Sequence, residues 1–243
     1  MWDGGAYLSL HQNRNSTMDI FEKILPNQVD NKKLYGSKEP IIEDQIVLLA
    51  QELIDWTEPT YEHSDKSQFE MGSSIFLQDI LNLLIRLTSA SRVLEIGTFV
   101  GMSAISFAKN NNVTVDTIEK YQSFADTARR NIQANNLDQR INVIVGDARD
   151  IMPTLQATYD LIFIDGDKEH YLDYFKMAAK KLSAKGLIIV DDIFFHGDVF
   201  NKKPLTSRGL GVKVLINYLK EVKTQFQYRI IPISNGVLIA SVR

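Results

Sequence analysis

The chain shows two hydrophobic patterns: short continuous apolar runs, and segments with apolar residues at helical spacing. Beyond about residue 90 these two patterns alternate. Short apolar runs have the length of buried strands, and most are followed by a segment with apolar residues at helical spacing. The expected strands are RVLEIG (92–97), VTVDTIE (113–119), INVIVG (141–146), DLIFID (160–165), GLIIVDD (186–192), YRIIPI (228–233) and GVLIASV (236–242). The expected helices among them are 102–110, 121–135, 148–155, 168–182 and 210–222. This alternation predicts a mainly parallel sheet with helices on both faces.

The end of the chain predicts one departure from the parallel pattern. The motif SNG at 234–236 separates the last two strands and is a hairpin signal, so one strand at or near an edge should be antiparallel. We therefore expect an α/β fold with a Rossmann-like, doubly wound, mostly parallel seven-stranded sheet. A C-terminal antiparallel hairpin strand and an N-terminal helical extension complete this prediction.

The region before the sheet has a different character. Residues 1–40 are polar and poorly periodic, which is typical of an N-terminal leader that lacks fixed structure. Apolar residues at helical spacing predict helices over 41–56 and 74–88, with a polar loop at 57–70 between them. The second helix is apolar over much of its surface, from Phe76 to Leu87, so we expect it to be buried. We predict one domain over 41–243, made of a helical cap (41–90) and a Rossmann-like core (91–243).

Composition narrows the functional classes. Apolar residues make up 44% and charged residues 23% of the 243 positions, which is ordinary for a soluble globular protein. The net charge of −3 gives the whole molecule no electrostatic attraction to nucleic acid or membranes. The absence of cysteine excludes disulfides, thiolate metal sites and a cysteine nucleophile. No apolar run reaches the roughly 18 residues of a membrane span, and no signal peptide is recognisable. We expect a cytoplasmic protein without a membrane partner.

Three strand ends carry residues suited to a nucleoside. Ligands of doubly wound sheets bind beyond the carboxyl ends of the strands. At the first end, EIGTFVG (95–101) has glycines that allow a tight turn and close backbone approach, followed by a helix N-terminus. Glu119 ends the second strand, 22 residues after Gly97, where a carboxylate can accept both hydroxyls of a ribose. Asp147, in GDA (146–148), ends the third strand beside an expected adenine pocket. Together these ends predict an adenosine-type ligand.

Two further strands end in carboxylates. If they are neighbours, Asp165, Asp191 and Asp192 converge at one rim, where they repel one another unless a proton or a cation neutralises them. Oxygen ligands of this kind suit a hard divalent cation, Mg²⁺ first and Mn²⁺ or Ca²⁺ as alternatives. Lys168 follows closely, and a lysine beside such a cluster can hold or accept the proton of a substrate hydroxyl. Asp167 fits the N-cap of the following helix.

These residues resemble those of a known family. The segment from about Met71 to Arg243 resembles the cation-dependent catechol and caffeoyl-coenzyme A type O-methyltransferases, which use S-adenosylmethionine. The likeness is carried by VLEIGTFVGMSA (93–104), IEK (118–120), VGDARDIMP (145–153), YDLIFIDGDKEHY (159–171) and GLIIVDDIFFHGDV (186–199). The acidic strand end with its lysine, followed by a second acidic strand end, is the most specific feature. The glycine motif alone is shared with the wider class of methyltransferases.

The resemblance implies a role for each matching position. Cofactor contacts are implied for Met71, Ser73, Glu95, Gly97, Thr98, Ser103, Glu119, Asp147, Ala148, Asp165 and Asp167. Metal ligands are implied at Asp165, Asp191 and Asp192, catalytic roles at Lys168 and Asp165, and acceptor contacts at Phe195 and His196. The resemblance further implies a small acceptor with a hydroxyl beside a second oxygen, such as a catechol, and a homodimer.

The sequence departs from the family at two places. Asp192 stands where the family usually has asparagine, which adds a negative charge to the expected metal site. The loop HGDVFNKKPLTSRGLG (196–211) differs from that of the plant enzymes, so a coenzyme A ester is not supported as the substrate.

Three alternatives remain open from the sequence. The acceptor could be 5-hydroxyuridine in tRNA, with Lys202, Lys203, Arg208 and Lys213 contacting phosphates. A nicotinamide-dependent oxidoreductase would use a similar fold, but the chain lacks G-x-G-x-x-G. A non-catalytic cofactor-binding module would have no need for three converging carboxylates.

Overall fold

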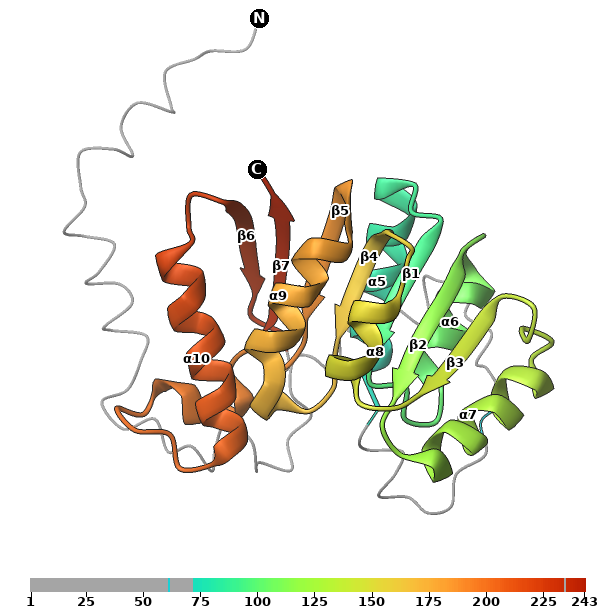
Figure 1. The fold of residues 1–243 in the computed structure, drawn as a ribbon, viewed down its shortest axis with the longest axis horizontal. Helices are drawn as coiled ribbons and strands as arrows, with labels where there is room; N and C mark the ends of the chain where they lie inside the picture. Colours follow the sequence, from blue (N-terminus) through green and yellow to red (C-terminus); the bar gives the residue numbers. More distant parts are fainter. Residues whose placement is uncertain (1–60, 62–71, 234) are drawn as a thin grey trace, which may run out of the picture. The chain divides into compact units, whose positions relative to one another are not determined.

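A seven-stranded sheet forms the centre of the fold (Figure 1). The computed structural model describes Tyr61, residues 72–233 and residues 235–243. The strands are β1 (Arg92–Ile96), β2 (Thr114–Glu119), β3 (Ile141–Val145), β4 (Tyr159–Ile164), β5 (Leu182–Val190), β6 (Phe226–Ile231) and β7 (Val237–Val242). The α-helices are α5 (Ile75–Thr88), α6 (Met102–Asn110), α7 (Gln122–Ala134), α8 (Ala148–Thr154), α9 (Tyr171–Lys181) and α10 (Ser207–Glu221). Two 3₁₀ helices are η2 (Lys168–His170) and η3 (Phe195–Phe200).

The strand order is β3-β2-β1-β4-β5-β7-β6. The first five strands are parallel, and β7 pairs antiparallel with both β5 and β6. This confirms the predicted doubly wound, mostly parallel sheet with an antiparallel hairpin strand near one edge. The chain winds outward from β1 to β3 and then returns to β4 on the other side of β1. Such a reversal opens a ligand crevice beyond the carboxyl ends of β1 and β4.

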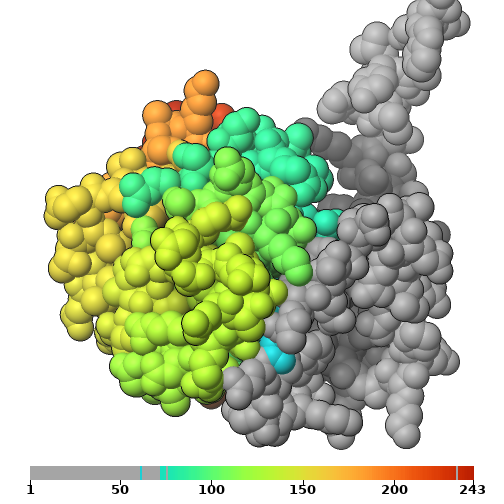
Figure 2. Space-filling model, turned by 90° about the vertical axis from the view of Figure 1, so that its right-hand side faces the viewer, coloured from blue at the N-terminus to red at the C-terminus, as the bar shows by residue number. Residues whose placement is uncertain are grey.

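The two faces of the sheet bury separate apolar cores. On one face, Leu94 and Ile96 of β1 pack with side chains from α8, α9 and α10, which lie in front of the sheet in Figure 1. On the other face, Val93 packs with side chains from α5, α6 and α7. Figure 2 looks at the β3 edge, where residues from the α6–α8 region form most of the coloured surface. Successive side chains of a strand point to opposite faces of the sheet, so each strand contributes to both cores.

Several element boundaries differ from the sequence prediction. The helix expected at 168–182 begins as the 3₁₀ turn η2, capped by Asp167, whose Oδ1 accepts a hydrogen bond from Glu169 N at 3.3 Å. Leu182 belongs to β5. The loop expected at 194–208 contains η3, and α10 begins at Ser207 because the Thr206 hydroxyl caps it. Leu87, expected to be buried, is 72% exposed at the end of α5.

The predicted leader (1–40), the helix at 41–56 and the loop at 57–70 apart from Tyr61 lie outside the described residues. The division into a helical cap and a core therefore stays a prediction. Within the described ranges, no helix is both long enough and apolar enough to cross a membrane.

Candidate active site

One cavity of about 650 Å³ opens at the carboxyl ends of the parallel strands. Its lining includes a residue at the carboxyl end of each of these five strands, namely Gly97, Glu119, Gly146, Asp165 and Asp191. This volume is typical of small-molecule sites. The cavity lies at the crevice that the strand order predicts.

The first loop crosses the fourth strand end very closely. Gly97 has φ +100°, a conformation that L side chains rarely adopt. A Cβ at this position would lie 2.8 Å from the carbonyl carbon of Asp165 and closer still to its oxygen. The backbones of the two loops can pack this closely only because residue 97 is glycine, as the predicted tight turn requires.

Glu119 is held rigidly at one end of the cavity. Its carboxylate accepts hydrogen bonds from the backbone amides of Phe99, at 2.8 Å, and Tyr121, at 2.9 Å. The rings of Tyr121 and Phe124 line the cavity beside it, as does Ala148. A fixed carboxylate next to an apolar wall suits a ribose and its base. The predicted positions of Glu119 and Ala148 therefore come together.

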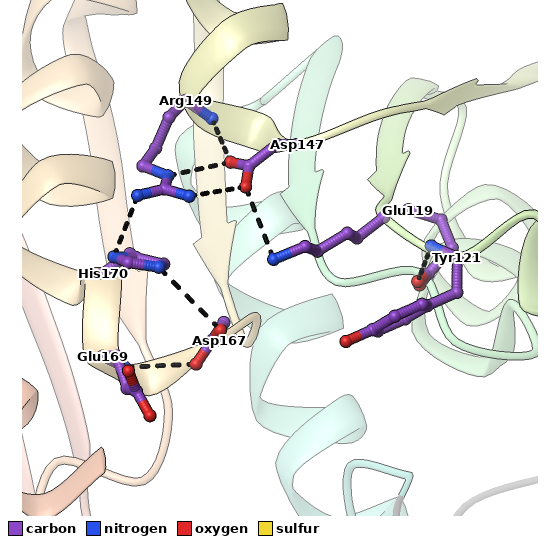
Figure 3. A network of polar contacts seen from close by, with 8 residues as sticks. Glu119, Tyr121, Asp147, Arg149, Asp167, Glu169 and His170 are labelled. Atoms are coloured by element: carbon purple, nitrogen blue, oxygen red, sulfur yellow. Dashed lines mark hydrogen bonds and ion pairs between the residues drawn. The ribbon is translucent and has the colours of Figure 1, made fainter. Parts of the chain in front are cut away.

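An arginine joins two loops at the same end (Figure 3). Arg149 Nε and Nη2 donate to the two carboxylate oxygens of Asp147 at 3.0 and 2.8 Å, and Nη1 lies 3.3 Å from His170 Nδ1. His170 Nε2 in turn lies 4.0 Å from Asp167 Oδ2. The hydrogen bond from Arg149 holds the pKa of Asp147 well below its usual range. The network links the loop after β3 to the loop after β4, a connection that no sequence motif indicated.

Asp147 itself does not line the cavity, although its neighbours Gly146 and Ala148 do. Its carboxylate is occupied by Arg149, by the backbone amide of Arg149 at 3.0 Å, and by Lys120 at 3.5 Å. Its predicted contact with a cofactor stays a prediction. In this structure Asp147 caps α8 and anchors the network.

Three predicted cofactor residues form a buried network beneath the first loop. Glu95 is fully buried and accepts hydrogen bonds from the hydroxyls of Ser103 and Thr117, the latter at 2.6 Å. Thr98 Oγ1 lies 2.6 Å from Thr117 Oγ1. Burial raises the pKa of Glu95 to about 8. Glu95, Thr98 and Ser103 do not line the cavity, so their contact with a cofactor stays a prediction, and they support the loop from within.

The acidic strand ends meet at the other end of the cavity. β4 and β5 are neighbours, with Ile164 opposite Val190, so the residues that follow them are adjacent. Asp165, Asp191 and Asp192 all line the cavity, as predicted. Ser73 Oγ donates to Asp165 Oδ2 at 3.3 Å, which places the segment before α5 at this rim. Met71 lies outside the described residues.

Lys168 lies between two of these carboxylates. Its Nζ is 2.8 Å from Asp192 Oδ2 and 3.3 Å from Asp165 Oδ1. Burial opposes the charged amine, but electrostatic interactions with Tyr171, Asp165 and Asp192 outweigh it and raise the pKa of Lys168. Burial also raises the pKa of Asp165 and Asp191, and repulsion between the carboxylates adds to the shift. Ionisation of all three carboxylates would therefore be favoured by a cation in addition to the Lys168 ammonium.

The predicted metal ligands share this rim without forming a compact ligand cluster. Among the described residues, no three acidic or histidine side chains are grouped closely enough to hold a metal ion. The donors nevertheless suit a hard cation, because they are all carboxylate oxygens. The Tyr171 hydroxyl beneath them is buried without a hydrogen-bond partner among the described residues, and the charges of the carboxylates reach it. A polar partner is therefore missing at this point.

A further wall of the cavity comes from η3 and the β6–β7 turn. Phe195 and His196 line the cavity, and their contact with an acceptor stays a prediction. His196 N donates to Asn235 Oδ1 at 3.2 Å, and Phe194 N donates to Asn235 O at 2.6 Å, so the turn supports η3. Asn235 and Arg208 also line the cavity. Sequence reasoning missed both, since Asn235 was read only as part of a turn signal and Arg208 only as part of a basic cluster.

Comparison with known proteins agrees with this geometry. Residues 47–242 match the family model described as O-methyltransferase. The chain is 38% identical over 122 residues to a catechol O-methyltransferase from Mycobacterium tuberculosis, an alignment that covers 49% of this chain and 56% of that protein. It is 34% identical over 128 residues to a catechol O-methyltransferase from Niastella koreensis, covering 50% of this chain and 58% of that protein. The matches thus span little more than half the length of these relatives.

Solved structures give the same result over more of the chain. An O-methyltransferase from Bacillus cereus in complex with SAH has a TM-score of 0.66 and 25% identity, covering 87% of this chain and 94% of that one. The family model spans most of the sequence, including every described strand and helix. The resemblance seen in the sequence motifs is confirmed, and the chain belongs to the O-methyltransferase family.

Proposed function

We propose that this chain is an S-adenosylmethionine-dependent O-methyltransferase that uses a divalent cation and methylates a hydroxyl of a small, catechol-like acceptor. The observation that carries the proposal is one cavity with two chemically different ends. Glu119 stands at the end suited to a nucleoside, and Lys168 stands between the carboxylates of Asp165 and Asp192 at the other. A methyl donor and a hydroxyl acceptor would meet between these ends.

The cofactor end fits a sulfonium nucleoside. Glu119 would accept the ribose hydroxyls, because two backbone amides already fix its orientation. The tight turn at Gly97 lets the backbone approach the ligand. Carboxylates on the cavity wall favour the positive sulfonium over its neutral product. Family membership and the SAH bound to the Bacillus cereus relative support this assignment.

The acidic rim fits a divalent cation. Asp165, Asp191 and Asp192 supply only oxygen donors, and burial together with mutual repulsion raises the pKa of Asp165 and Asp191. When bound, the cation would supply Lewis acidity to neighbouring acceptor oxygens. The motif match to the cation-dependent members of the family supports the same assignment.

The protein's own residues would then orient the acceptor. Lys168 Nζ would hold the reacting oxygen, since two carboxylates fix the ammonium in place. Phe195 and His196 would wall the acceptor ring. The acceptor hydroxyl would lose its proton to water, and its oxygen would bond to the methyl carbon as the carbon–sulfur bond breaks and leaves its electrons on sulfur. Most of the acceleration comes from alignment.

The small-molecule acceptor is favoured over tRNA by the arrangement of the basic cluster. Lys213 Nζ donates to the carbonyls of Asn201 and Lys202, so it holds the end of η3 together. Arg208 lines the cavity. Lys202 and Lys203 remain as exposed cations that could face phosphates. Family membership also argues against the nicotinamide-dependent alternative.

The proposal is tested by transfer of labelled methyl from S-adenosylmethionine to a catechol panel, with Mg²⁺ and with excess chelator. We expect transfer that chelator abolishes. Asp165→Asn should lose most metal-dependent transfer while it still binds S-adenosylmethionine. Asp138→Asn, an exposed site away from this cavity, is the matched control and should behave like the wild type. Full, chelator-resistant transfer by Asp165→Asn would contradict the metal assignment.

A further inference from the structure

We propose that Arg208 selects acceptors that carry a carboxylate in addition to the reacting hydroxyl. The inference rests on the proposed function, because it names the acceptor class for the same cavity. Arg208 lies in the first turn of α10 (Ser207–Glu221) and lines the cavity. Three observations carry the assignment: its position relative to Lys168, its lack of a partner, and the charge of the remaining wall.

The packing of α10 places Arg208 on the Lys168 side of the cavity. The Ser207 hydroxyl donates to a carboxylate oxygen of Glu169. A Cβ at Gly211 would lie 2.6 Å from Glu169 Cα and closer still to the carbonyl oxygen of Lys168. Arg208 lies between these two contact points along the helix. Its side chain lines the cavity, on the helical turn that packs against the segment carrying Lys168.

Among the described lysines and arginines that line the cavity, Arg208 is the one with no ion pair to a described carboxylate. Lys168 lies between Asp165 and Asp192, and Lys120 lies 3.5 Å from Asp147. Across the described residues, Arg208 forms no hydrogen bond, ion pair or ring contact with another side chain. An unpaired guanidinium at a cavity mouth is available to a ligand.

The other charged residues of the cavity wall restrict an acceptor carboxylate to the position beside Arg208. The lining carboxylates are Glu119, Asp165, Asp167, Asp191 and Asp192. An anionic group on the acceptor is repelled by these residues, so the arrangement that places it beside Arg208 has the lowest energy. A guanidinium pairs with a carboxylate through two parallel hydrogen bonds, which also fixes the ring orientation. The reacting hydroxyl would then face Lys168 while the carboxylate faces Arg208.

The experiment compares a vicinal dihydroxybenzoate with the matching neutral dihydroxybenzamide. For the wild type we expect kcat/KM to favour the acid by roughly tenfold, the gain of one charge-assisted pair. Arg208→Gln should abolish this preference, mainly by raising KM for the acid, and leave the amide nearly unchanged. Arg208→Lys should restore part of it. Lys203→Gln removes one charge from the same basic loop outside the cavity lining and should keep the full preference.

Equilibrium binding of the same two compounds, with S-adenosylhomocysteine present, separates this inference from the proposed function. Binding of the acid that depends on Arg208 supports the inference even if no methyl is transferred, and that result would contradict the proposed function alone. Equal acid-to-amide ratios in the wild type and Arg208→Gln would overturn the inference. So would an equal loss in Lys203→Gln, because the effect would then be general attraction by the loop.

Discussion

Gly211 controls the distance between α10 and the segment that carries Lys168. In Gly211→Ala, the new methyl group would meet backbone atoms, with Glu169 Cα at 2.6 Å and the Lys168 carbonyl oxygen closer. Backbone atoms cannot rotate away, so α10 or η2 must shift. Overpacking of this kind costs about 1–3 kcal/mol. The better helix propensity of alanine returns about 0.8–1 kcal/mol, so the net loss should be about 0–2 kcal/mol. The melting temperature should therefore fall by at most roughly 8 °C.

The effect on the reaction should be larger than the effect on stability. A shift of about 1 Å in Lys168 would lower kcat on the order of 100-fold, because the reaction depends on alignment. Thermal melts and methyl-transfer kinetics at a temperature where both proteins are folded measure the two effects. Gly209→Ala is the control on the same helix, since the three atoms nearest to its new methyl all belong to the Asp198 side chain and not to backbone. It should lose stability but keep kcat. Wild-type kcat in Gly211→Ala would refute the proposed positioning of Lys168.

Three further predictions concern the buried network and the loops at the cofactor end of the cavity. Burial raises the pKa of Glu95 to about 8, so its protonated form favours the fold, and its contribution is lost between its unfolded pKa and about pH 8. In Glu95→Gln the free energy of unfolding should fall less steeply with pH; the wild-type slope from this group is at most about 1.4 kcal/mol per pH unit. Identical pH profiles of unfolding in the two proteins would contradict this prediction. Gly97→Ala should abolish S-adenosylmethionine binding, because its Cβ would meet Asp165; calorimetry showing normal affinity would refute this. Arg149→Met should weaken cofactor binding severalfold by releasing Asp147, whereas Arg130→Met, at an exposed position of α7, should not.

The sheet was predictable because its strands follow one simple rule. Parallel strands buried on both faces give short apolar runs, and the alternation with helices fixes the fold class. The boundaries that differed depend on tertiary contacts that a local pattern does not contain. Two glycines weaken the helical signal at the start of α10, but the Thr206 cap and contact with η2 hold its first turn. Leu87 has the helical spacing of the buried residues of α5, yet no described residue covers the end of this helix, so Leu87 is exposed.

The site was predictable where chemistry depends on strand ends. Asp165 and Asp191 follow adjacent strands, so their meeting follows from the topology. Residues that reach the cavity from later elements were harder to find. Arg208 arrives through packing of α10 on η2, a contact between segments far apart in sequence. Glu95 is a different case: the motif identifies the residue, but the sequence does not show that its carboxylate is fully buried beneath the loop.

The net charge of the acidic rim, formed by Asp165, Asp191, Asp192 and Lys168, bears on both the bound cation and the charge of the acceptor. Asp165, Asp191, Asp192 and Lys168, when ionised, leave two net negative charges, which one divalent cation would balance. With asparagine at position 192, as is usual in the family, the same cation would leave one positive charge to attract an acceptor anion. We infer that Asp192 removes this attraction from the rim. An acidic acceptor would then need a cation elsewhere on the wall, and Arg208 is placed to supply it. Asp192→Asn should therefore reduce the dependence of acid binding on Arg208, and the double variant with Arg208→Gln measures that coupling.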